Sequence, residues 1–310
     1  MVMRIFVIAM NAYRESVRAR LLIGLFGVAV ATCAYAVVVA SLSLHQEARV
    51  VSDLGSSSIS LYAALVAIVL GATSLHREVE QKTVFPILAR PLARHEYMLG
   101  KYFGALATLL VFIAVDAAIV LAILALLTDQ KPALVLGAAA ALLAILAGLL
   151  VRAKHTRVYV LIPWALAALL AMALLASTAG DDRRLVLSSM LLTLCEVSIV
   201  TAVATLFSSF SSPMLTAMFS FGVFIIGRSA DTLAHLPARQ LGGGARAAGA
   251  LLARVFPNLN LYVPPRPVLL GQVADLPIWP YVGASALHAA AYSALLLAIA
   301  WLMFRKRDFT

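Results

Sequence analysis

The sequence predicts an all-α, polytopic helical membrane protein, and three observations lead to this fold class. Of the 310 residues, 63% are hydrophobic and only 12% are charged. The mean hydropathy is +0.98. Soluble domains are about half apolar and about a quarter charged, so these values exclude an ordinary globular enzyme and a disordered chain. The third observation is a series of apolar runs near the roughly 20 residues that a helix needs to cross a bilayer.

Eight apolar runs are expected to be membrane spans within one transmembrane domain, residues 1–310. They are 21–44, 58–75, 102–127, 133–151, 158–178, 185–207, 213–228 and 281–304. The 213–228 run is short and is expected to be a tilted span or half of a broken one. Six spans are the alternative, if 133–178 forms a buried or interfacial hairpin.

The charge distribution predicts which ends of the spans face the cytoplasm. The net charge is +10, from 24 Lys and Arg against 14 Asp and Glu. Excess cations in a membrane protein gather on cytoplasmic loops, so membrane lipid and not nucleic acid is the expected neighbour of this charge. With a cytoplasmic N-terminus, most Lys and Arg residues fall inside. We therefore expect a bacterial inner-membrane protein with both termini in the cytoplasm.

Residues 1–20 precede the first span and have an amphipathic pattern. Apolar residues recur at helical spacing at Ile5, Phe6, Ile8, Ala9, Ala12 and Tyr13. Polar residues occupy other positions, among them Arg4, Arg14 and Glu15. This pattern predicts a helix that lies in the cytoplasmic interface. A disordered basic leader that only sets the orientation is the alternative.

The cytoplasmic segment 76–101 combines charged clusters with an apolar patch. Pro86 and Pro91 exclude one continuous helix, so we expect a short helix, a turn and a second helix that leads into the next span. Such an element suits docking into a groove on a soluble partner. An ordinary basic loop held at lipid headgroups is the alternative.

The residues of this segment resemble a known family. The pattern consists of Glu78, Glu80, Lys82-Thr83, the block from Leu88 to Arg94, Glu96-Tyr97 and Leu99-Gly100-Lys101-Tyr102. It resembles the first cytoplasmic loop of type-2 ABC exporter permeases. Three later segments agree with that family: Ser208–Pro213 is similar to its serine-rich turn, Pro257–Asn260 to its outer loop, and Arg305–Phe309 to its basic C-terminus.

The resemblance implies a dimer of six-span subunits that separate cytoplasmic ATPases drive. It implies that an N-terminal elbow helix and the first cytoplasmic loop contact the ATPase. The residues expected at this contact are Glu78, Glu80, Arg90, Pro91, Arg94 and Glu96. The implied partners are an ABC ATPase dimer and a second permease copy, or a related permease. This chain departs from the family at 133–178, where an inserted transmembrane hairpin is expected.

The chain lacks the motifs of a nucleotide or metal site. No Gly-x-x-x-x-Gly-Lys-Ser/Thr loop is present, so ATP and Mg are expected on the partner ATPase. The six histidines have no metal-ligand spacing, and HExxH and GxSxG are absent. We therefore expect no catalytic residue, cofactor or metal in this chain, and no enzyme activity of its own.

Three ionisable residues fall inside apolar runs: Asp116, Glu196 and His288. An ionisable side chain in the membrane costs at least about 2.5–3.5 kcal/mol, so each is expected to face a cavity, a partner or a dimer interface. They are candidates for a polar substrate path or for a switch in the conformational cycle. Hydrogen bonding between helices that only fixes the packing is the alternative.

The loop 229–280 is expected on the outside, with an interfacial or re-entrant helix over 245–256 that acts as a lid or a structural cap. Together these features predict the permease subunit of an ABC exporter. Two other functions stay open. One is an ion-coupled secondary transporter that uses Asp116 and Glu196. The other is a non-transporting membrane scaffold or assembly factor.

Overall fold

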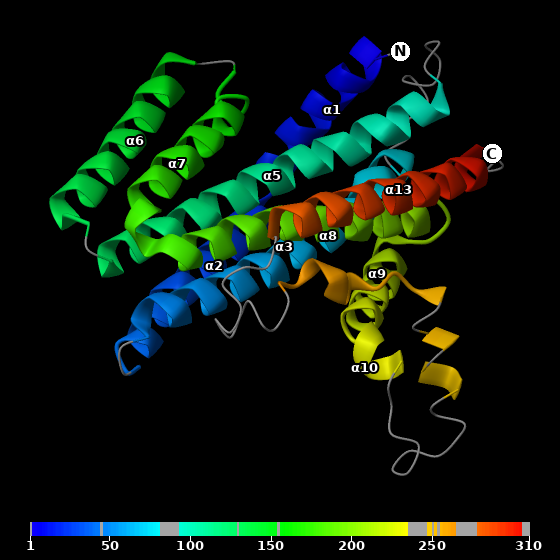
Figure 1. Ribbon diagram of the computed structural model, residues 1–310. Helices are drawn as coiled ribbons and strands as arrows, with labels where there is room; N and C mark the ends of the chain where they lie inside the picture. The colour runs from blue at the N-terminus through cyan, green and yellow to red at the C-terminus, as the bar shows by residue number, and fades with distance from the viewer. Residues whose placement is uncertain are drawn as a thin grey trace.

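The computed structural model shows a helical protein (Figure 1). It describes residues 2–43, 46–80, 93–128, 130–153, 156–234, 247–249, 251–252, 255–264 and 278–305. Its α-helices are α1 (Val2–Val17), α2 (Arg20–Ala40), α3 (Glu47–Glu80), α5 (Arg94–Leu127), α6 (Pro132–Arg152), α7 (Leu161–Leu175), α8 (Gly180–Ser208), α9 (Pro213–Arg228), α10 (Ala230–Ala234) and α13 (Ile278–Arg305). Two 3₁₀ helices, η1 (Ala176–Ala179) and η2 (Leu259–Tyr262), complete the described elements, which include no strand.

The apolar helices confirm the prediction of an all-α, polytopic membrane protein. Among the described residues, six helical stretches are long and apolar enough to cross a membrane: 20–40, 47–73, 94–127, 132–152, 161–208 and 278–303. The 161–208 stretch contains two helices, α7 and α8, joined by η1. Helix α9 is also apolar but has only 16 residues.

Three helices form the centre of the bundle. The apolar windows of α3 and α5 are each 61% buried, and that of 161–208 is 67% buried, whereas the windows of α2 and α6 reach only 17% and 6%. The core that α3, α5 and α8 share includes Leu109, Ile113, Leu121 and Ile199, all at most 1% exposed. Helices α2, α9 and α13 pack around this centre and leave wide apolar surfaces exposed.

The two ends of the bundle differ. At one end, which we call the terminal end, lie α1, the first turns of α5 and the last turns of α13 (Figure 1). There Met98 and Tyr102 of α5 pack against Leu297 and Ala300 of α13. The opposite end carries the first turns of α3 and α8. Segment 81–92, which joins α3 to α5, lies outside the described residues.

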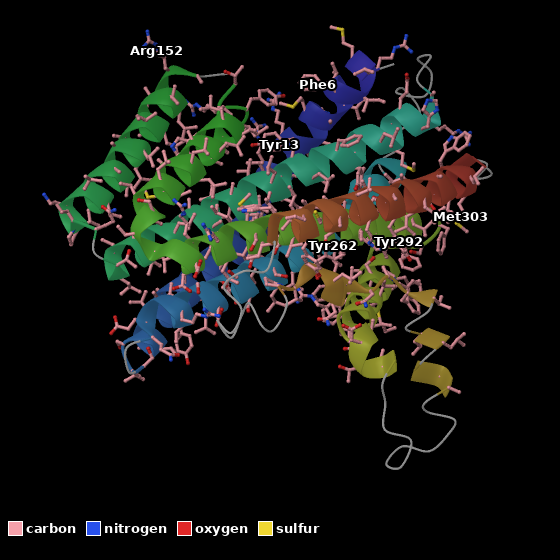
Figure 2. All side chains as sticks on the ribbon, in the orientation of Figure 1. Phe6, Tyr13, Arg152, Tyr262, Tyr292 and Met303 are labelled. Carbon is pink, nitrogen blue, oxygen red and sulfur yellow. The ribbon has the colours of Figure 1, made fainter. Side chains whose placement is uncertain are left out.

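Helix α1 packs tightly on the first turns of α5. Gly100 and Gly104 lie on the same face of α5, and a Cβ atom at Gly104 would come within 2.6 Å of the Ala9 carbonyl oxygen. Small residues four apart let two helix backbones approach this closely. Phe6, expected on the packed stripe, projects away from α5 instead and is 62% exposed (Figure 2). The apolar surface of α1 is therefore divided between α5 and the surroundings.

Helices α6 and α7 form an antiparallel hairpin beside α5 (Figure 1). Trp164 of α7 donates a hydrogen bond to the Leu142 carbonyl of α6 at 2.9 Å. At the hairpin tip, the Tyr13 hydroxyl of α1 donates to the Val158 carbonyl at 3.0 Å, and the rings of Tyr13 and Tyr159 stack. Burial raises the pKa of Tyr13 to about 12, so the phenol keeps the proton that it donates. Arg152, next to the tip, points away from the bundle (Figure 2).

Gly180 makes the reversal from α7 to α8 possible. Its φ is +50°, a value that glycine adopts without the steric cost of a Cβ. The chain turns there, so that α8 runs back along α5 toward the terminal end (Figure 1). The tight Ser209–Ser212 turn then leads into α9, whose first residue, Pro213, needs no amide partner.

Helix α3 extends beyond the apolar run expected at 58–75 in both directions. It starts at Glu47, and its serines are compatible with the helix because they hydrogen-bond to its own backbone. Ser52 donates to the Arg49 carbonyl and Ser58 to the Gly55 carbonyl. Both serines are buried. At its other end, residues 76–80, expected in a separate short helix, continue α3 to Glu80. The helix expected over 245–256 lies largely outside the described residues.

We expect Gly104→Val to lower the stability of the protein by about 1–3 kcal/mol, the usual cost of overpacking a tight contact. The added side chain meets the backbone of α1, which cannot give way as a flexible side chain can. Gly137→Val in α6 is the matched control, because no atom outside its own helix lies within 4 Å of that Cβ position. Thermal unfolding midpoints in one detergent provide the measurement, and equal midpoints for the two variants would contradict this packing.

Candidate functional site

A buried cluster of charged and polar side chains joins three helices. Glu196 of α8 is fully buried. Its two carboxylate oxygens accept hydrogen bonds from Arg228 of α9, with Nε–Oε1 at 2.6 Å and Nη2–Oε2 at 2.8 Å. Ser60 of α3 donates to Glu196 Oε2 at 2.9 Å and accepts a short hydrogen bond from Arg228. This two-pronged geometry is the strongest form of arginine–carboxylate contact.

The end of α9 places Arg228 in this cluster. Arg228 is the last residue of α9, where a cation interacts favourably with the helix dipole. The chain continues into α10, and Asp231 of α10 accepts hydrogen bonds from the side-chain amides of Asn258 and Asn260. Between these two asparagines, Leu259 is fully buried. The Pro257–Asn260 segment singled out in the sequence is thus tied to the end of α9.

A polar cavity of about 440 Å³ adjoins the cluster. It lies between α3, α8, α9 and the 262–264 segment. It is lined by Asp53, Ser56, Ser57, Ser60, Leu61, Ser189, Thr193, Phe224, Arg228, Tyr262, Val263 and Pro264. Six of these residues carry a hydroxyl group, and the Arg228 side chain keeps 29% of its surface exposed. The site can therefore hold a polar molecule against an ion pair and a row of hydroxyls.

The structure connects His288 with this region. The Tyr262 hydroxyl and His288 Nδ1 of α13 are 2.8 Å apart. The centroid of the His288 ring is 6.3 Å from that of Tyr262 and 6.0 Å from that of Tyr292. Tyr262 is buried and lines the cavity. Two of the three ionisable residues predicted inside the membrane, Glu196 and His288, therefore border one site.

Asp116 lies elsewhere in the bundle, between α5 and α2. It is fully buried, and its Oδ1 accepts a hydrogen bond from the Cys33 thiol at 3.5 Å. Its Oδ2 has no hydrogen-bond partner among the described residues. Asp116 is thus a separate polar point, and the structure does not bring it to the cluster of Glu196.

The predicted partner contact is described only in part. Arg90 and Pro91 lie outside the described residues, and the side chains of Glu78 and Glu80 are not described either. Arg94 begins α5 at the terminal end. Glu96 is buried, where its carboxylate accepts from the Ala93 amide at 3.4 Å and lies 3.9 Å from Arg4 of α1. Glu96 therefore joins α5 to α1 and does not present its charge at the surface.

Lys101 and Glu15 form a second link between α1 and α5. The Lys101 ammonium lies 3.3 Å from the Glu15 carboxylate, and it also lies over the Tyr97 ring at 5.9 Å from the centroid. The Lys101 side chain is only 5% exposed, so its charge depends on these contacts. The two ion pairs flank the close backbone contact at Gly100 and Gly104.

Sequence reasoning missed Arg228, Ser60 and the cavity. A signal for the cavity was available, because Asp53, Ser56, Ser57 and Ser60 recur at the spacing of one helix face. Arg228 stood at the edge of an apolar run, where a basic residue is ordinary. Only the packing of α9 against α8 shows that it is the partner of Glu196. Among the described residues, no group of three or more His, Cys, Asp and Glu side chains could hold a metal ion.

We expect the Glu196–Arg228 pair to behave non-additively under mutation. Removing one partner of a buried ion pair costs about 3–5 kcal/mol, whereas removing both costs far less. Arg228→Leu should be the more damaging single change, because it leaves a carboxylate with no access to water. After Glu196→Leu, the partly exposed Arg228 can turn toward the cavity.

A double-mutant cycle in thermal or denaturant unfolding measures this coupling. The variant that carries both leucines should recover much of the stability that Arg228→Leu loses. Strictly additive losses would show that the pair does not hold the helices together.

Comparison with protein-family models and with curated proteins finds no match to the chain.

Proposed function

We propose that the chain is the permease subunit of an ABC exporter, in which a separate cytoplasmic ATPase dimer drives conformational work or translocation across the membrane. The observation that carries this proposal is the junction of α1 and α5. Helix α1 is joined to the first turns of α5 by close backbone packing and by the pairs Arg4–Glu96 and Glu15–Lys101. This arrangement suits an elbow helix that moves together with a partner-binding segment.

The lengths of α3 and α5 support the same proposal. Each has 34 residues, which corresponds to about 50 Å of helix. The hydrocarbon core is only about 30 Å thick, so each helix has turns to spare beyond it. Helix α3 ends and α5 begins at the terminal end, which we assign to the cytoplasm. A partner that binds the segment between them would contact the ends of both helices.

Helix α3 connects the terminal end directly with the cluster of Glu196, Arg228 and Ser60. Ser60 of α3 bonds Glu196 of α8, and Asp53 and Ser56 of α3 line the cavity. A shift of α3 along α8 would therefore change the hydrogen bonds of the ion pair and the shape of the cavity together. ATP and Mg would be bound by the ATPase, and this chain would carry no catalytic residue.

We assign eight spans, with α6 and α7 as an added hairpin. The hairpin tip contacts Tyr13 of α1, so the tip lies at the same membrane face as the elbow helix. The turn between α7 and α8 at Gly180 then lies at the other face. A second copy of the chain, or a related permease, would complete the transporter in a bacterial inner membrane.

The ion-coupled alternative has one observation in its favour. Asp116 has a carboxylate oxygen without a partner among the described residues, as an ion or proton site could have. Glu196, the other acid that this mechanism would use, is already neutralised by Arg228. The geometry thus leaves the ion-coupled mechanism with one candidate acid in place of two.

We expect an ABC ATPase to co-purify with the wild-type protein from native membranes in mild detergent. Arg94→Glu should reduce the recovered ATPase at least about tenfold, because placing like charges together at an interface costs several kcal/mol. Arg184→Glu is the control, since Arg184 is exposed and lies in the first turns of α8 at the opposite end. Quantitative mass spectrometry measures the ratio. No ATPase with a folded wild-type protein would refute the proposal.

We also expect Asp116→Asn to leave the ATPase rate of the complex unchanged. The amide oxygen of the asparagine can still accept from the Cys33 thiol, so the packing of α2 on α5 should persist. Ion-coupled transport predicts the contrary: in proteoliposomes, an imposed proton gradient would drive solute flux without ATP in the wild type, and Asp116→Asn would abolish that flux. The two proposals are separated by this pair of measurements.

A further inference from the structure

The polar cavity contains oxygen atoms that the protein does not satisfy. Asp53 Oδ1, Ser56 Oγ and Ser189 Oγ are buried and have no hydrogen-bond partner among the described residues. All three residues line the cavity, and Ser189 is only 4% exposed. Buried polar atoms in proteins are nearly always hydrogen-bonded. Three such atoms belong to residues of one cavity wall, where small side-chain rotations would bring them within reach of an occupant.

These three residues lie within one helical turn of each other along the cavity. Helices α3 and α8 run in the same direction (Figure 1), and Ser60 and Glu196 fix their register by direct contact. Two helical turns from this contact, toward the opposite end, lie Asp53 on α3 and Ser189 on α8. Ser56 lies one turn from Asp53 on the same face of α3. An occupant at this level would meet oxygens from both helices.

The charges around this level favour a cation. Arg49 lies 3.9 Å from a carboxylate oxygen of Asp53 and 3.9 Å from one of Asp182, so one cation serves two acids. The charge of Arg228, deeper in the cavity, is balanced by Glu196. The unpartnered Asp53 oxygen can only accept a hydrogen bond when the carboxylate is ionised. An anion at this level would lie beside an acid that is not fully neutralised.

We infer that this cavity binds a small hydroxylated molecule with a primary ammonium group. The ammonium has three N–H donors and lies among Asp53, Ser56 and Ser189. The hydroxyls of the molecule bond to the remaining serine, threonine and tyrosine side chains of the wall. A cavity of about 440 Å³ has room for such a molecule and a few waters, each of which takes up about 30 Å³. This inference does not depend on the proposed function, because the subunit alone carries the cavity.

The test compares three probes of nearly equal shape on the full-length subunit in phosphatidylglycerol nanodiscs, whose lipid carries no amine. Serinol is glycerol with its central hydroxyl replaced by an ammonium group, and glycerate is the anionic counterpart. Saturation-transfer NMR titrations give the three affinities. We expect serinol to bind about tenfold more tightly than glycerol, which corresponds to the net worth of one charged hydrogen bond, and glycerate to bind most weakly.

Variants assign the binding to this cavity. Asp53→Asn should reduce serinol to the affinity of glycerol, whereas Asp181→Asn, an equal charge change at an exposed position outside the cavity, should leave serinol binding unchanged. Ser189→Ala should weaken serinol several-fold at an unchanged unfolding midpoint, because its hydroxyl has no protein partner, and this variant carries the test if Asp53→Asn fails to fold. Equal affinities for serinol and glycerol, tighter binding of glycerate, or serinol binding that survives both cavity variants would overturn the inference.

Discussion

The arrangement of the helices depends on the ion pair between Glu196 and Arg228. A carboxylate that is fully removed from water in an apolar bundle is costly, and only a well-formed contact with a cation and further hydrogen bonds offsets that cost. Arg228 supplies two donors, and Ser60 satisfies a further lone pair. The pair therefore requires α9 to end beside the middle of α8 and requires α3 to present a serine at the same level. Helix α9 has only 16 residues and ends at Arg228, the residue that meets this requirement.

A second constraint acts at the terminal end, where α1 and α5 are in backbone contact. Gly104 has no room for a side chain, and the Glu15–Lys101 pair is largely shielded from water on its Lys101 side. Ion pairs with one partner this buried are screened by salt less than surface pairs are. Helix α1 is therefore held to α5 by contacts that an interfacial helix lying only on lipid would lack. The hairpin tip adds to this assembly through Tyr13, so α1, α5 and the inserted hairpin meet at one place.

Hydropathy could predict the apolar helices because a membrane-crossing helix needs a continuous run of about 20 apolar residues. Such a run can be recognised from neighbouring residues alone. Each of the eight predicted apolar runs overlaps a described helix, although 21–44 extends past the end of α2 at Ala40 and 158–178 begins before α7 at Leu161. The beginning of α3 was missed because the predicted run started at residue 58, after the polar residues of 47–57. One of these, Ser52, satisfies its hydroxyl on its own helix through the Arg49 carbonyl. That Glu196 needs a partner could be foreseen from the cost of a buried charge. The identity of the partner could not, because Arg228 is 32 residues away on another helix and only packing brings the two together. Glu96 shows the same limit: a charged residue in a cytoplasmic segment read as a surface contact, and the fold buries it against α1.

The two constrained regions lie far apart, and α3 and α8 are described helices that extend from the ion pair toward the terminal end. From Ser60 to Glu80, α3 continues without a break, a length of about 30 Å. If this helix stays straight, it moves as a rigid unit. A displacement of its end at residue 80 then also displaces Ser60. Ser60 is also the point at which small movements matter most, because its hydroxyl bonds both members of the ion pair. A shift of about one ångström there would break at least one of these two hydrogen bonds. Helix α3 thus connects the end of the bundle at which we propose that a partner binds with the ion pair of Glu196 and Arg228, as the proposed conformational cycle requires.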